Sequence, residues 1–255
     1  METPRPPFSL AGRRALVTGA SRGLGAAIAL GLAEAGADVA LHGNTRSPDD
    51  ARARALALGR RAVALTGDLA DPETPARLVD EAVRALGGLD ILVNNAGTIR
   101  RAAAEDTTDA DFSHVLAVDL EAVFRLCRAA GRGMLEQGHG KIVNVASLLS
   151  FQGGIRVPAY AAAKAGVAAL TKALANEWAA RDVNVNAIAP GYMKTDNTAA
   201  LREDPVRSRQ ILERIPAGRW GDPEDLVGAA VFLSSSASDY VHGHVLVVDG
   251  GWLGR

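Results

Sequence analysis

The feature that most constrains the fold is a series of short, almost continuously apolar runs separated by longer alanine- and leucine-rich segments. Most runs lack the apolar–polar alternation of a strand with one wet face, so they predict strands buried on both faces, as in a parallel sheet. The intervening segments are mostly long enough for crossover helices. We therefore expect an α/β fold: a single Rossmann-type, doubly wound domain over residues 8–255, with a seven-stranded parallel sheet and helices on both faces. The predicted strands cover residues 14–19, 38–43, 62–68, 89–95, 140–147, 183–191 and 244–251.

The ends and the bulk composition exclude several classes of protein. Residues 1–7 contain three prolines and no signal-peptide core, so we expect a flexible tail there. No run approaches the roughly 18 consecutive apolar residues of a transmembrane helix. A single cysteine, Cys127, cannot form an internal disulfide. The 28 basic and 29 acidic residues give a net charge of -1, which argues against a nucleic-acid-binding surface. We expect a cytoplasmic protein with no membrane or nucleic-acid partner.

A glycine-rich loop follows the first predicted strand. The segment VTGASRGLGAAIA at 17–29 contains Gly19, Gly23 and Gly25 with the spacing G-x-x-x-G-x-G. Glycines allow close approach of the backbone to a pyrophosphate, and a helix N-terminus adds partial positive charge. Such a loop also forms ordinary tight turns, but its position between a strand and a helix predicts a dinucleotide site.

The second predicted strand bears on the choice of dinucleotide. Dinucleotide folds often place an acid at its end to bind the adenosine ribose, whereas this chain has Gly43 and Asn44. Arg22 and Arg46 are either ligands of a 2′-phosphate or solvated loop residues, so NAD versus NADP stays open. Asp68, after the third strand, either accepts a hydrogen bond from the adenine amino group or caps a turn.

Tyr160 and Lys164 lie four residues apart, on one face of a predicted helix. A free phenol holds its proton too tightly for acid–base catalysis at neutral pH. An ammonium about 4 Å away, at an effective dielectric constant of about 20, favours the phenolate by about 4 kcal/mol, which is the size required. Ser147 ends the strand at 140–147, where parallel sheets bind ligands. Tyr-x-x-x-Lys also arises often by chance, so the prediction depends on its occurrence together with Ser147 and the other motifs of the chain.

The combination resembles the short-chain dehydrogenase/reductase (SDR) family over residues 10–255, through the glycine loop, Asn-Asn-Ala-Gly at 94–97, Ser147, Tyr-x-x-x-Lys and Pro-Gly at 190–191. The resemblance implies that Tyr160 exchanges a proton with the substrate oxygen and that Ser147 holds this oxygen. It implies that Lys164 favours the ionised tyrosine and binds the nicotinamide ribose, and that the enzyme is a homotetramer. The NAD(P) ligands that it implies, with those predicted above, are Gly19, Ser21, Arg22, Gly23, Leu24, Gly25, Asn44, Arg46, Asp68, Leu69, Asn95, Ala96, Gly97, Tyr160, Lys164, Pro190, Gly191, Met193 and Thr195.

One position departs from the family pattern. The family has an Asn on the helix after the Asn-Asn-Ala-Gly strand, where it supports a proton-relay water, whereas the segment VLAVDLEAVF places Asp119 there. An aspartate lacks the amide donor, and its charge would act on the lysine and the water chain. Asp119 is therefore a candidate fourth member of the catalytic set whose role stays open. Because the serine, tyrosine and lysine are intact, we expect an enzyme; a nucleotide-binding regulator with weak catalysis is the alternative.

Several loops indicate the substrate. Residues 95–101, 146–160, 186–198 and 214–226 resemble the SDR subgroup that acts on 2-dehydro-3-deoxy-D-gluconate and 2-deoxy-D-gluconate, which implies interconversion of a hydroxyl and a ketone on a deoxy-keto sugar acid. Such a substrate needs an arginine for its carboxylate and polar partners for its hydroxyls. We expect a mobile lid at 192–213, a fixed helical insertion being the alternative. The candidate substrate ligands are Ser147, Leu149, Gln152, Arg156, Arg100, Tyr192 and Asn197.

Other chemistries in the same family remain open. A gluconate 5-dehydrogenase or a 3-oxoacyl-carrier-protein reductase would carry the same motifs. The carrier-protein reductase would need a basic surface patch, which the balanced charge does not favour. The five histidines show no metal-ligand spacing, so no metal is expected.

Overall fold

The computed structural model describes residues 6–255 and contains a seven-stranded sheet with the order β3-β2-β1-β4-β5-β6-β7. All neighbouring strands are parallel, which confirms the predicted α/β fold. The chain leaves the centre of the sheet in one direction through β1–β3 and in the other through β4–β7, so the carboxyl ends of β1 and β4 flank the topological switch point. The strands are β1 (Arg14–Val17), β2 (Asp38–Gly43), β3 (Ala62–Thr66), β4 (Ile91–Asn94), β5 (Gly140–Val145), β6 (Val183–Pro190) and β7 (Val245–Val248).

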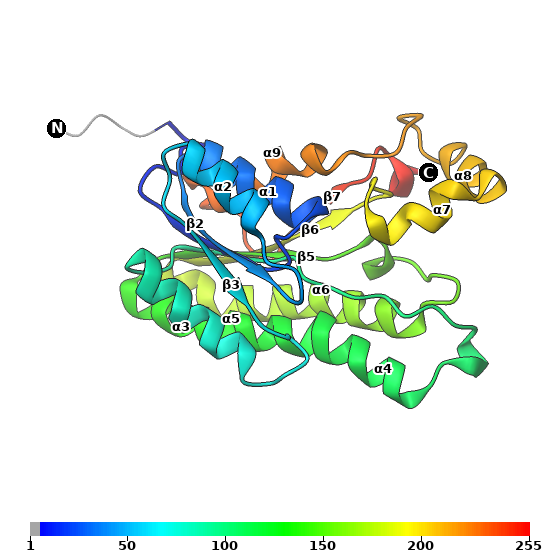
Figure 1. The fold of residues 1–255 in the computed structure, drawn as a ribbon, viewed down its shortest axis with the longest axis horizontal. Coiled ribbons are helices and arrows are strands. Elements are labelled where there is room, and N and C mark those ends of the chain that lie inside the picture. The colour runs from blue at the N-terminus through cyan, green and yellow to red at the C-terminus, as the bar shows by residue number, and fades with distance from the viewer. Residues whose placement is uncertain (1–5) are drawn as a thin grey trace.

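Helices cover both faces of the sheet (Figure 1). One layer contains α1 (Gly23–Glu34), α2 (Asp49–Ala57) and α9 (Val227–Ser234). The opposite layer contains α3 (Thr74–Leu86), α4 (Asp109–Leu116), α5 (Ala122–Gln137) and α6 (Pro158–Trp178). Two short helices, α7 (Ala199–Glu203) and α8 (Pro205–Leu212), follow β6 and lie beyond its carboxyl end.

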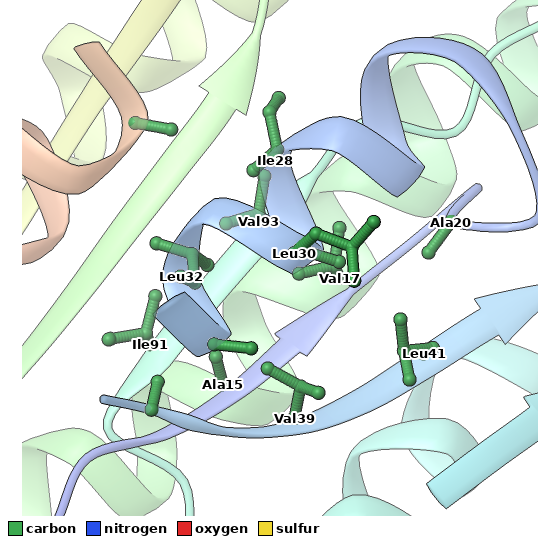
Figure 2. Packing of buried hydrophobic residues seen from close by; sticks show 14 of the residues in the cluster. Ala15, Val17, Ala20, Ile28, Leu30, Leu32, Val39, Leu41, Ile91 and Val93 are labelled. Atoms are coloured by element: carbon green, nitrogen blue, oxygen red, sulfur yellow. The ribbon is translucent and has the colours of Figure 1, made fainter. Parts of the chain in front are cut away.

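The continuous apolar runs contribute residues to two hydrophobic cores, one on each face of the sheet. In β1, Ala15 and Val17 belong to the core beneath α1, whereas Leu16 between them belongs to the opposite core. Figure 2 shows the first of these cores, in which Ile28 and Leu32 of α1 pack over the strands. Because successive strand residues point to opposite faces, a strand with helices on both sides needs apolar residues at every position.

The amino-terminal segment is described only in part. The predicted tail covers residues 1–7, of which 1–5 lie outside the described residues. The main-chain carbonyl of Pro7 accepts hydrogen bonds from the Ala237 amide and the Ser236 hydroxyl, at 3.2 and 3.1 Å. Among residues 6–255, no helix has the length and apolar character needed to cross a membrane.

Candidate active site

The glycine loop connects β1 to α1 and packs tightly against the end of β4. Gly19 and Gly23 have φ values of +66° and +56°, in the left-handed region that favours glycine. A Cβ atom on Gly25 would collide with the Gly19 carbonyl and the Asn95 side chain. The Asn95 amide nitrogen donates to the carbonyls of Thr18 and Gly19, at 2.9 and 3.1 Å. The loop is thus held in a shape that side chains would block.

His42, near the end of β2, supports the same loop from beneath. Its side chain is buried. The Gly19 amide donates to Nδ1 at 3.4 Å, and Nε2 lies 2.9 Å from the Gly67 carbonyl. Burial lowers the pKa of His42 below its ordinary value, so the neutral ring with a proton on Nε2 satisfies both contacts. His42 was not predicted from the sequence as a site residue, because a histidine in an apolar strand has no motif.

A cavity of about 830 Å³ opens at the carboxyl ends of the strands. Every residue predicted above to bind NAD(P) lines it, as do Ser147, Arg100 and Asn197 from the predicted substrate set. The start of α1 faces it through Gly23 and Leu24. The wall also contains residues that the sequence analysis did not name as ligands: His42, Thr45, Thr98, Ile99, His114, Val118, Val145, Ala146, Lys194, Asp196 and Thr198.

Two arginines and an asparagine line this cavity from two loops: Arg22 lies in the glycine loop, and Asn44 and Arg46 follow β2. Arg22 forms an exposed ion pair with Asp196 at 2.9 Å, and Arg46 forms one with Asp50 at 3.3 Å. Exposed pairs of this kind are weak, so both guanidinium groups are free to turn to a stronger anion. The cavity wall therefore carries two guanidinium groups, and residues 43–48 at the end of β2 include no acidic side chain.

Tyr160 and Lys164 lie on the first two turns of α6, which begins at Pro158. Lys164 is only 3% exposed, and its ammonium donates to the Val145 carbonyl at 2.8 Å. The same nitrogen lies 5.6 Å from the centre of the Tyr160 ring. The helix thus fixes a buried positive charge beside a phenol that lines the cavity.

The loop after β5 ties Ser147 to the same helix. The Ser147 hydroxyl accepts from the Leu149 amide at 3.1 Å, at the start of a short 3₁₀ turn over Leu148–Ser150. The Ser150 hydroxyl donates to the main-chain carbonyl of Lys164 at 2.6 Å. This bond joins the serine loop to the lysine turn of α6, so Ser150 is a structural link that the motif did not reveal.

Asp119 lies in a π-helical turn, Ala117–Glu121, between α4 and α5. Its side chain is fully buried, and Oδ1 accepts from the Thr98 amide at 2.7 Å. Oδ2 lies 3.9 Å from the Lys164 ammonium and has no hydrogen-bond partner among the described residues. Burial raises the pKa of this carboxyl above its ordinary value, while Lys164 and the Thr98 amide oppose the rise.

The predicted substrate residues separate into two groups. Ser147, Arg100 and Asn197 line the cavity, with Arg100 3.6 Å from Asp111. Leu149, Gln152, Arg156 and Tyr192 lie outside its lining.

The second group has other contacts. Gln152 Oε1 accepts from the Trp252 indole at 3.2 Å, and Tyr192 packs between Trp220 and Trp252. A Cβ atom on Gly154 would meet the Leu149 side chain. Arg156 is exposed with φ +63°, and its carbonyl accepts from the Ala102 amide at 3.2 Å.

His114 adds a titratable side chain to the cavity wall. It lies on α4, one turn before Val118, and both line the cavity with Arg100. His114 was not predicted from the sequence because it has no metal-ligand spacing. Its one available signal was its distance of five residues from Asp119.

Within the segment 192–213, residues 193–198 line the same cavity. The segment contains a 3₁₀ turn at Asp196–Thr198 followed by α7 and α8. Ile211 of α8 is buried in a small cluster with Leu148 and Trp252, separate from the two main cores. Arg101 donates to the Asn197 carbonyl at 3.0 Å, which links this segment to the loop after β4.

Comparison with known proteins agrees with this geometry. Residues 19–253 match the family model described as enoyl-(acyl carrier protein) reductase. The 2-dehydro-3-deoxy-D-gluconate 5-dehydrogenase of Dickeya dadantii is 53% identical over 97% of this chain and 98% of its own.

Two solved structures extend the match. A protein from Agrobacterium tumefaciens, described as a 2-deoxy-D-gluconate 3-dehydrogenase with bound NADP, is 57% identical with a TM-score of 0.92, over 98% of this chain and 100% of its own. A Beutenbergia cavernae protein, described as an NAD(P)-dependent gluconate 5-dehydrogenase with NADP at low occupancy, is 53% identical with a TM-score of 0.94 and the same coverage. The predicted resemblance is confirmed: the chain belongs to the short-chain dehydrogenase/reductase family.

Proposed function

We propose that the protein is an NADP(H)-dependent oxidoreductase that interconverts a hydroxyl and a ketone on a deoxy-keto sugar acid of the 2-dehydro-3-deoxy-D-gluconate class. The observation that carries the proposal is the placement of Tyr160, Lys164 and Ser147 on one cavity with the glycine loop. The names of the relatives at 53% and 57% identity supply the substrate class.

The residues of the chain handle the proton. Tyr160 donates it to the ketone oxygen in reduction and accepts it from the hydroxyl in oxidation. The buried Lys164 charge favours the phenolate form of the tyrosine, and the Ser147 hydroxyl holds the substrate oxygen. Asp119 takes the position of the family's relay residue. A 3₁₀ turn and the bond from Ser150 to Lys164 keep the serine in register with the tyrosine helix.

The glycine loop and the start of α1 fit a dinucleotide. The close packing at Gly19 and Gly25 and the helix start at Gly23 suit a pyrophosphate. Arg22, Arg46 and Asn44 favour a 2′-phosphate, in line with the NADP in the related structures. A bound nicotinamide cofactor supplies or accepts the hydride in such enzymes.

The substrate end suits an acid with several hydroxyls. Arg100 and His114 offer positive charge or hydrogen-bond donors on the cavity wall, and Asn197 offers an amide from the opposite segment. Arg156 holds a left-handed backbone conformation on the neighbouring loop, which is a feature of ligand clamps. We assign the substrate carboxylate to this end, with residues 192–213 as a lid.

Turnover of a substrate panel tests the proposal. Purified protein is given 2-dehydro-3-deoxy-D-gluconate, gluconate and a 3-oxoacyl thioester, each with both cofactors, and the reduced-nicotinamide absorbance is followed. The proposal predicts the highest kcat/KM for the deoxy-keto acid with NADP. A higher kcat/KM for gluconate, the substrate in the name of the Beutenbergia relative, would support the reaction type and contradict the proposed substrate. Cofactor binding without turnover across a wider panel of sugar acids would favour a regulator.

The assembly and location remain predictions. We expect a homotetramer in the cytoplasm, and light scattering of the purified protein tests the first point. The half-exposed Phe112 and Phe124, on α4 and α5, are candidates for burial in such an assembly.

A further inference from the structure

The carboxyl of Asp119 is fully buried, and its two oxygens have different surroundings. One oxygen is satisfied by the Thr98 amide, and the other has no hydrogen-bond partner among the described residues although it faces Lys164 at 3.9 Å. The Lys164 ammonium is itself 5.6 Å from the Tyr160 ring centre. A negative charge at Asp119 therefore acts on Tyr160 through the lysine that the tyrosine depends on.

We propose that Asp119 is a positioning residue that acts through Lys164, and that its negative charge partly offsets the lysine charge and so sets the pH at which Tyr160 becomes an effective base. An asparagine at this position carries no charge and cannot do this. The titratable groups that act on Asp119 are Lys164 on α6 and His114 on α4. The direction of the Asp119 pKa, raised by burial, agrees with a carboxyl that is only partly stabilised as an anion.

The sign of the effect follows from electrostatics. A carboxylate beside the lysine disfavours the phenolate, so removing the carboxylate charge makes Tyr160 ionise more readily. Asp119→Asn should move the rising limb of the pH–rate profile for oxidation to lower pH. The expected shift is about one pH unit, the size produced by a unit charge beyond the direct neighbour at an effective dielectric constant of about 20.

Two measurements test this inference. The first depends on the proposed function, and the second does not. The first is the pH dependence of kcat for oxidation in the parent and in Asp119→Asn. The second is an ultraviolet titration of the tyrosines without substrate or cofactor, with Tyr160→Phe in each background to isolate the Tyr160 signal. The titration reports on Tyr160 even if the substrate assignment fails.

Asp109→Asn is the matched control, because it makes the same charge change at the exposed start of α4. We expect Asp119→Asn to shift both the rate profile and the Tyr160 titration to lower pH, and Asp109→Asn to shift neither. If Asp119→Asn lowers kcat while both curves stay in place, or if they shift to higher pH, the inference is overturned. Should Asp119→Asn fold poorly, Asp119→Ser is measured in its place with the same expected shift.

Discussion

Two buried aspartates near the two ends of the sheet show how differently one fold treats the same side chain. Asp90 precedes β4 at the amino end and is 3% exposed; Asp119 lies near the carboxyl end and is fully buried. Asp90 accepts from Arg14 Nε at 2.7 Å and Nη2 at 3.1 Å, and lies 2.9 Å from His139 Nε2. Asp119 has one main-chain donor and a lysine at 3.9 Å.

The electrostatic consequences are opposite. Burial works against ionisation of both side chains. At Asp90 the hydrogen bonds from Arg14 and His139 outweigh burial and hold the pKa at about 2. At Asp119 burial prevails and the pKa is raised. The fully paired site joins strands and stabilises the fold, whereas the incompletely paired site retains electrostatic influence over its neighbours, as expected where chemistry takes place.

The largest expected effect is a loss of activity at the carboxyl end of the sheet. Tyr160→Phe removes the hydroxyl that we propose as proton donor and leaves the packing of the ring, so kcat/KM should fall by roughly 10³-fold with little change in stability. Steady-state kinetics, with cofactor binding and urea unfolding as controls, provide the measurement. Activity within tenfold of the parent would remove Tyr160 from the proton-transfer role.

At the amino end the expected effect is on stability. Asp90→Asn leaves Arg14 without its carboxylate partner and should lower the free energy of unfolding by about 3 kcal/mol. Urea denaturation measures this change, and kcat per folded molecule should stay at the parent value. A large fall in kcat with unchanged stability would erase the distinction between the two ends.

Acid titration of stability is the next test. Because the folded-state pKa of Asp90 is about 2, below the ordinary value of about 4 for an aspartate, its contribution is present above about pH 4 and is lost as the pH falls towards 2. The amount is about 2 kcal/mol. Between about pH 4 and pH 2, the unfolding free energies of the parent and Asp90→Asn should converge by this amount. A constant difference between the two proteins over this pH range would contradict the lowered pKa of Asp90.

The smallest expected effect concerns the cofactor. Arg22→Ala should weaken NADP binding about tenfold, ~1.4 kcal/mol, and leave NAD binding nearly unchanged, because only the 2′-phosphate loses a charged partner. Fluorescence titration with both cofactors measures it. Arg46→Ala is the matched variant, and if it alone loses NADP affinity, the phosphate lies on the Arg46 side.

The sheet and the glycine loop were predictable because their determinants are local in sequence. Runs of apolar residues report strands buried on both faces, and the glycine pattern reports a loop that side chains would obstruct. The predicted strand 38–43 matches Asp38–Gly43, whereas the other six overran at their carboxyl ends, for example 14–19 against Arg14–Val17, because those residues turn into loops.

The contacts between distant segments were less predictable at both ends of the sheet. Gln152 is bonded to Trp252, a hundred residues away, and at the amino end of the sheet Asp90 is bonded to His139 and Arg14. His114 and Ser150 acquire their positions only when α4, α6 and the loop after β5 meet. No period or spacing in the sequence encodes these encounters.

The most direct test of the contrast is to measure Asp90→Asn and Asp119→Asn side by side for unfolding free energy and for the pH–rate profile of oxidation. We expect Asp90→Asn to lose about 3 kcal/mol of stability and to keep the profile in place. We expect Asp119→Asn to change stability by less than about 1 kcal/mol and to shift the profile to lower pH. Equal losses of stability with both profiles unmoved would contradict the contrast between the two aspartates.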